Sequence, residues 1–244
     1  MARSKSSYRR LDAGKVILTI DRLRDRIAER FGDAGLVEVA AELSRLARDT
    51  ENRARTFGRP YYLLRALDLV LTVGVLAVGG LIVSQIDWAS LTDGNDLLNL
   101  TQGLDSLVNL ALLLGGGIWF LLTLEERWKR ARVQRWLHEL RAFAHVIDMH
   151  QLTKDPTVIL RAGSATPSSP QRAMSEFQLT RYLEYCAEML SLNGKLSAVY
   201  AGQSNDHVII AAAGDVENLC TDLGRKVWQK IMILSQLDER REDH

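Results

Sequence analysis

Cysteine and proline are scarce in this chain, and each scarcity excludes something. The two cysteines, Cys186 and Cys220, are too far apart for a CxxC metal or redox motif. Both should be reduced thiols if this part of the chain is cytoplasmic. Three of the four prolines fall within residues 153–174, which mark the one clear interruption of helical patterning. No segment alternates with period two for long, so we predict an all-α protein.

Charge is also missing from two stretches, Leu69–Ile86 and Leu107–Leu124, which contain no ionisable residue. A hydrocarbon core of about 30 Å needs about 20 helical residues, and each stretch has 18. We therefore expect an integral membrane protein whose two transmembrane helices, residues 61–86 and 107–124, form a hairpin. The alternative is a buried helix of a large soluble domain. The opposite charge patterns on the two sides of each stretch favour the membrane.

Lys and Arg are absent from residues 86–106, which instead carry four Asp. Residues 1–60 have a net charge of +5 and residues 125–141 a net charge of +3. Basic residues beside spans stay on the cytoplasmic side. We expect both termini in the cytoplasm, an acidic loop over 87–106 outside, and a plasma or bacterial inner membrane. Met1–Lys15 has no signal-peptide core, so the first span should act as an uncleaved anchor.

Polar and small residues at the spans are candidates for function. Arg65 and Asp68 are three residues apart and can pair at the edge of the first span, or Asp68 can face a water-filled path. Glycines are the second feature, since small residues let helices approach closely in lipid. They are helix-packing or hinge candidates: Gly74, Gly79, Gly80, Gly115, Gly116 and Gly117.

The remaining residues predict a cytoplasmic helical bundle built from both ends of the chain. Residues 1–60 form a helical hairpin, 125–152 an extension helix, 153–175 a linker and 176–244 the C-terminal helices. In the extension helix a seam recurs at steps of four and three, as in a short coiled coil: Val133, Leu137, Leu140, Ala144 and Ile147. Asn193-Gly194 is expected to interrupt the first C-terminal helix.

Basic residues beside the spans can bind anionic lipid headgroups. The candidates are Arg53, Arg55, Arg59, Arg127, Lys129 and Arg130. A solvated face crossed by ion pairs is the other interpretation, because acidic residues interrupt every basic run. The same interruption argues against nucleic acid as a partner.

Signatures of catalysis are missing. The chain has no phosphate loop, dinucleotide fingerprint, nucleophile elbow or kinase motif. His138-Glu139 does not continue into a zinc motif, because Ala142 stands where the second His is needed. We expect no catalytic residue, no metal and no cofactor, and hence no enzyme.

Two functions remain. The first is a non-enzymatic scaffold or sensor whose cytoplasmic bundle forms a homo-oligomer or binds a protein partner, with the lipid bilayer as its platform. The second is an oligomeric pore-forming or membrane-disrupting effector that is gated by its cytoplasmic domain. This layout is similar in outline to two-span effectors of bacterial immune systems. The resemblance is one of architecture and implies that the spans carry the output.

Overall fold

The computed structural model describes residues 11–32, 34–57, 62–84, 97–152, 154 and 174–242. These residues form seven helices and no strand, which confirms the all-α prediction. The side chains of some residues in the third and fourth helices and at the end of the last are not among those described. The helices are α1 (Ala13–Phe31), α2 (Gly35–Phe57), α3 (Tyr62–Ser84), α5 (Leu97–Leu122), α6 (Leu124–Leu152), α8 (Glu176–Ala201) and α9 (His207–Glu242).

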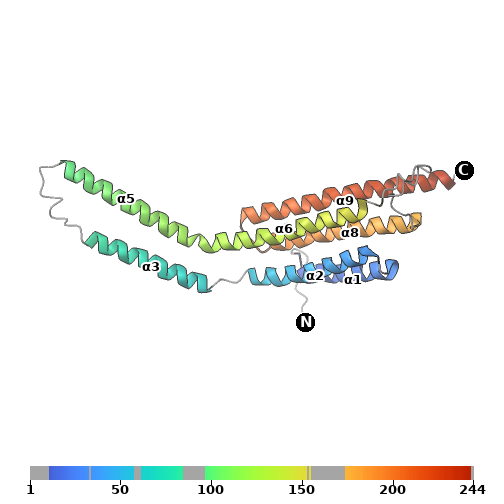
Figure 1. Ribbon diagram of the computed structural model, residues 1–244, viewed down its shortest axis with the longest axis horizontal. Coiled ribbons are helices and arrows are strands. Elements are labelled where there is room, and N and C mark those ends of the chain that lie inside the picture. The colour runs from blue at the N-terminus through green and yellow to red at the C-terminus, as the bar shows by residue number, and fades with distance from the viewer. Residues whose placement is uncertain are drawn as a thin grey trace, which may run out of the picture. The chain divides into compact units, whose positions relative to one another are not determined.

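The chain divides into two compact units (Figure 1). One, called the bundle here, comprises Met1–Gly58 and Arg132–His244 and so contains α1, α2, α8, α9 and most of α6. The other, called the hairpin, comprises Arg59–Ala131 and contains α3 and α5.

In the bundle, α1 and α2 form the expected helical hairpin. The Asp12 side chain starts α1 by accepting hydrogen bonds from the N–H groups of Gly14 and Lys15. Gly32 ends α1 with a φ of +57°, a left-handed conformation that glycine adopts without steric cost. The apolar positions of α1, among them Ile20, Leu23 and Ile27, are buried, as their helical spacing predicts.

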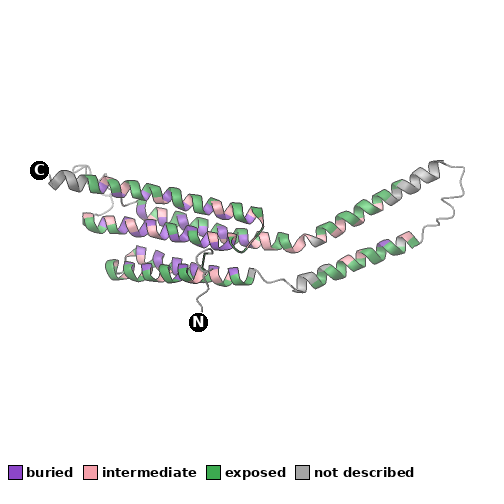
Figure 2. Ribbon diagram, turned by 180° about the vertical axis from the view of Figure 1, so that it is seen from behind, coloured by how far each residue is buried: buried purple, intermediate pink, exposed green. Residues whose placement is uncertain are grey.

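Helix α8 lies at the centre of the bundle core. Fifteen of its 26 residues are buried, and it packs on α1, α2 and α9. A capping box at its start joins Ser175 and Gln178 reciprocally. The seam predicted in α6, from Val133 to Ile147, is buried at all five positions. Figure 2 shows that the buried faces of these helices turn toward one another.

The predicted interruption at Asn193-Gly194 is wrong, because α8 runs through both residues without a break. Packing explains the difference. Gly194 lies where α8 meets α9 so closely that an added Cβ would be 3.4 Å from Cys220 Cβ. The Asn193 side chain is fully buried and donates from Nδ2 to the carbonyl oxygen of Leu140 at 2.9 Å. Tertiary contacts therefore override the weak helix propensity of both residues.

In the hairpin, α3 and α5 pack side by side (Figure 1). Helix α5 starts at Leu97, within the segment expected to be a loop, and ends at Leu122. A turn at Thr123 separates α5 from α6. The Thr123 hydroxyl lies 3.1 Å from the carbonyl oxygens of both Trp119 and Phe120. Such hydroxyl bonds to the preceding turn bend helices.

Length and apolar character together limit which helices can cross a bilayer. Among the described residues, no single helix meets both requirements. Val108–Leu121 meets them only together with Leu124–Leu152, from which it is bent by 41°. In α3, the apolar stretch found within the described residues, Leu69–Leu81, is shorter. The two predicted spans are therefore not confirmed as separate membrane-crossing helices.

Candidate membrane interface

The hairpin leaves most of its described apolar side chains uncovered (Figure 2). Leu69, Val70 and Leu81 on α3 are each about two-thirds exposed, and Leu112 and Leu113 on α5 are 70% and 74% exposed. The others exposed in these helices are Leu67, Leu71, Val73, Leu76, Val78, Val108, Trp119 and Phe120. The stretches without charge in the sequence therefore expose apolar side chains on both α3 and α5.

The size of this apolar surface indicates that something other than water must cover it. Burying one large apolar side chain is worth about 1.5–3 kcal/mol. If thirteen such side chains stay roughly half exposed in water, the chain loses on the order of 10–20 kcal/mol of the free energy that their full burial would provide. That is comparable to the whole stability of an ordinary domain. Patches of this kind mark a surface that lipid or another protein covers.

Of the predicted packing glycines, Gly79 makes a close helix contact. A Cβ added to it would lie 2.7 Å from Leu114 Cδ1, so its missing side chain lets α3 approach α5. A Cβ added at any of the other predicted glycines in these helices (Gly74, Gly80, Gly115, Gly116 and Gly117) would meet nothing within 4 Å. Those five positions do not pack the two helices of one hairpin together.

Aromatic and basic side chains meet where α5 gives way to α6. The Arg127 guanidinium lies over the rings of both Trp119 and Phe120, 5.6 and 5.1 Å from their centroids. Trp128 is 58% exposed beside it. Aromatic rings with an adjacent cation suit the boundary between hydrocarbon and headgroups, where one end of the group is apolar and the other is wet.

The predicted headgroup contacts divide into two groups. Arg127 and Lys129 lie in the first turns of α6, within the hairpin unit, where Lys129 pairs with Glu125 at 2.7 Å, and Arg130 is half-buried near them. Arg53 and Arg55 lie in the bundle on α2, and Arg55 pairs with Glu51 at 2.6 Å. Arg59 lies outside the described residues.

Arg53 belongs to a cluster that the sequence did not reveal. Its guanidinium donates to the Glu139 carboxylate and lies 5.5 Å from the centroid of Trp136, which stacks on Tyr200. Burial alone would lower the pKa of Arg53, but the hydrogen bond and charge of Glu139 raise it overall. The cluster joins α2, α6 and α8. No local pattern brings these four residues together, because they come from three distant segments.

The polar pair predicted at the edge of the first span stays a prediction. Arg65 and Asp68 lie within α3, but their side chains are outside the described residues. The predicted linker, residues 153–175, is likewise outside them apart from Lys154, Met174 and Ser175.

The titratable side chains of the bundle do not gather into a metal centre. Among the described residues, no three His, Cys, Asp or Glu side chains are placed to hold a metal ion. Cys186 and Cys220 are both free and buried. Burial raises the pKa of the Cys186 thiol to about 12 and that of Cys220 above its ordinary value. Neither thiol is therefore a thiolate nucleophile near neutral pH.

No protein-family model matches the chain, and neither a curated protein nor a solved structure matches it. A fold by itself does not fix a function.

Proposed function

We propose that the chain is a non-enzymatic membrane protein that crosses the bilayer twice. The hairpin of α3 and α5 anchors it, and the bundle acts in the cytoplasm as a scaffold or sensor that self-assembles or binds a protein partner. One observation carries the proposal: apolar side chains of the hairpin are exposed along the lengths of α3 and α5. Lipid covers such a surface without requiring a specific partner.

The charges of the chain support the same orientation. Basic residues dominate both segments that adjoin the spans, and the segment between the spans has no Lys or Arg. Arg127 with Trp119 and Phe120 forms an anchor on the cytoplasmic side. Each unit then has a surface that suits its surroundings. The bundle, which lies in water, buries its apolar seams, and the hairpin, which lies in lipid, exposes its apolar side chains.

The lengths of α3 and α5 suit the proposed spans. By length alone, the 23 residues of α3 extend about 34 Å and the 26 of α5 about 39 Å. Each helix is therefore long enough to reach across a hydrocarbon core of about 30 Å.

A second candidate function, an oligomeric pore, is favoured by one stripe of α5. Asp105, Asn109, Leu112 and Gly116 recur at steps of four, three and four, so they share a face. All four are exposed. In an oligomer this stripe would offer an acid, an amide and a glycine to a water-filled lumen.

Matched substitutions test the membrane anchor. Leu112→Asp places a charge on the exposed face of α5, and Leu18→Asp does the same at a 59% exposed position of α1 in the bundle. A charge within a span costs about 2.5–3.5 kcal/mol. We expect Leu112→Asp to lower the fraction of chain that stays with membranes in alkaline carbonate, and Leu18→Asp to leave that fraction unchanged. Release of the wild-type chain by carbonate would refute the anchor.

Dye release separates the two functions. The full chain is reconstituted into vesicles loaded with a fluorescent dye, and release is compared with that from empty vesicles. A scaffold leaves the dye inside. A pore releases it, and Gly116→Leu, which places a large apolar side chain on the α5 stripe, would then reduce the release. Release that Gly116→Leu abolishes would overturn the scaffold and establish the pore.

A further inference from the structure

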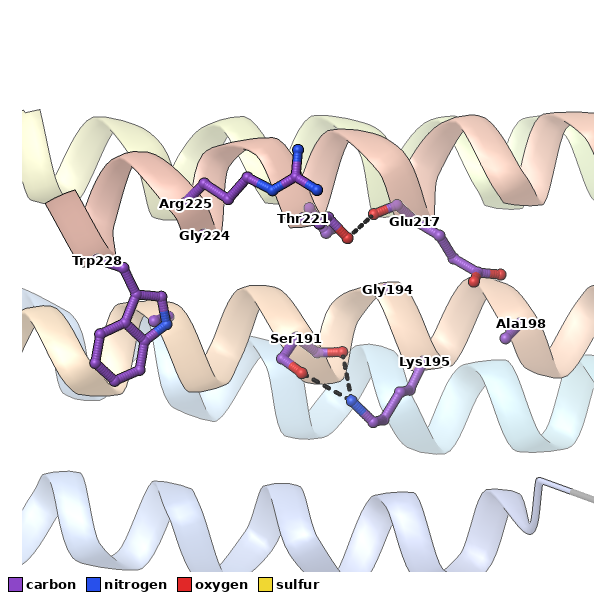
Figure 3. A pocket seen from close by; sticks show the side chains of 11 residues that line it. Ser191, Gly194, Lys195, Ala198, Glu217, Thr221, Gly224, Arg225 and Trp228 are labelled. Carbon is purple, nitrogen blue, oxygen red and sulfur yellow. Dashed lines mark hydrogen bonds between the residues drawn. The ribbon is translucent and has the colours of Figure 1, made fainter.

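A groove of about 370 Å³ lies on the bundle surface between α8 and α9 (Figure 3). Small residues form its α8 wall, where Ala187, Ser191, Gly194 and Ala198 recur at steps of four, three and four. This spacing keeps them on one face of α8. Side chains of this size allow another helix to approach closely.

The α9 wall repeats the same spacing with different chemistry. Glu217, Thr221, Gly224 and Trp228 also recur at steps of four, three and four. Figure 3 shows the Trp228 indole at one end of the groove and the Glu217 carboxylate toward the other. Trp228 is 54% exposed. An exposed Trp beside a groove of small residues is typical of an interface anchor.

A basic and an acidic side chain lie on opposite walls of the groove, at about the same position along its length. Lys195 belongs to α8 and Glu217 to α9, and a Cβ added to the neighbouring Gly194 would lie 3.7 Å from Glu217 Cα. Among the described residues, the two form no ion pair with each other. Lys195 Nζ instead donates to the carbonyl and hydroxyl oxygens of Ser191, at 3.4 and 2.7 Å. Each wall therefore carries a charge that complements the opposite wall.

We propose that two copies of this chain associate through this groove, in parallel, about a two-fold axis that runs along it. The proposal rests on the proposed self-assembly and names the surface that performs it. In this arrangement α8 of each copy faces α9 of the other. Lys195 then faces Glu217 of the second copy, and the symmetry repeats the pair. Counted along the antiparallel helices from this pair, Ser191 faces Thr221 and the small Ala187 faces Arg225.

The charges favour a second copy of this chain as the occupant of the groove, and they favour its parallel orientation. Because the groove contains both members of the ion pair, a second copy supplies both complements without another protein. An antiparallel two-fold would place α8 against α8, where the groove offers Lys195 no acid. It would also place α9 against α9, and Thr221 against its own counterpart where the axis crosses the groove at that level.

Cross-linking tests the register. Ser191→Cys and Thr221→Cys chains of full length carry different tags, are mixed in mild detergent and are oxidised. Both replaced residues are exposed, whereas the native Cys186 and Cys220 are buried. We expect a disulfide-linked pair that carries both tags, and no cross-link in the wild type. Efficient self-cross-linking of Thr221→Cys alone would overturn the parallel arrangement, and no cross-link in the mixture would overturn the interface.

Charge exchange tests the ion pair. Lys195→Glu or Glu217→Lys alone should weaken dimerisation about tenfold, because each creates two like-charged pairs. The double exchange should restore it. Lys226→Glu makes the same charge change on α9 outside the groove and should have no effect. Sedimentation velocity of the full chain in detergent measures the dimer, and circular dichroism confirms that each variant is folded.

Failure of the double exchange to restore the dimer, or an equal loss in Lys226→Glu, would contradict the proposed contact. Retention in membranes after carbonate is measured on the same variants and should not change. Loss of the dimer with retained membrane binding would show that the groove is needed for dimerisation and not for anchoring. Release of every variant from the membrane would instead refute the anchor.

Discussion

Replacing Asn193 with Asp should make the stability of the bundle strongly dependent on pH. Asn193 is completely buried in α8 and donates from Nδ2 to the carbonyl oxygen of Leu140 and to the Cys220 sulfur. Among the residues that the structure describes, its Oδ1 has no hydrogen-bond partner. A carboxylate in the same place loses both donors and carries an unpaired charge in a dry interior. A protonated carboxyl retains one donor for the Leu140 carbonyl.

The size of this pH dependence follows from the free energy needed to keep the introduced carboxyl group protonated in the folded chain. An Asp in an unfolded chain has a pKa of about 3.9. Holding the buried acid protonated at pH 7 therefore costs about 4 kcal/mol, at about 1.4 kcal/mol for each pH unit. Because the folded pKa lies above the unfolded one, the penalty is absent below about pH 4 and grows as the pH rises. A loss of this size is a large part of the stability of most domains.

Urea unfolding of the full chain in mild detergent measures the effect by circular dichroism between pH 4 and pH 7. The free-energy difference between wild type and Asn193→Asp should widen by about 4 kcal/mol over this range. Asn205→Asp is the control, because Asn205 is exposed between α8 and α9 and the difference there should stay below about 0.5 kcal/mol. A loss in Asn193→Asp that is under about 1 kcal/mol or independent of pH would refute the dry environment of Asn193.

Two further predictions concern the hairpin and the buried thiol. Gly79→Leu should loosen the contact of α3 with Leu114, by about 1–3 kcal/mol, whereas Gly80→Leu has open space and should not. The rate of limited proteolysis in detergent distinguishes them, and equal rates would contradict the close approach at Gly79. Burial raises the pKa of the Cys186 thiol from its ordinary value of 9.0 to about 12 in the folded chain. The stability that the protonated thiol contributes is therefore complete below about pH 9 and is lost as the pH rises toward 12. The difference in unfolding free energy between wild type and Cys186→Ala should therefore shrink by up to about 1.4 kcal/mol per unit above pH 9, and a constant difference would be inconsistent with the buried thiol.

The apolar seams were predictable because helical periodicity is a local property. The α6 seam and the apolar face of α1 are buried as their spacing predicts. The exposed faces of α3 and α5 also follow from sequence, since a segment without charge has no polar side to present. Local patterning therefore identified both the core positions and the candidate interface.

Long-range contacts were not predictable in the same way. Asn193 and Gly194 have low helix propensity, and only the packing of α8 on α9 reveals why a helix contains them. The contacts of Arg53 with Glu139 and Trp136 depend on α2 meeting α6. The groove between α8 and α9 has the same origin, since each wall alone resembles an ordinary polar helix face.

The most direct test of the central claim is the accessibility of single cysteines in intact cells. Ser90→Cys lies in the acidic segment expected outside, and Ser235→Cys lies at an exposed position of α9 in the bundle. A maleimide that cannot cross membranes should label Ser90→Cys in intact cells, and Ser235→Cys only after permeabilisation. Labelling of both before permeabilisation, or of neither, would contradict a chain that crosses the membrane twice with its bundle inside.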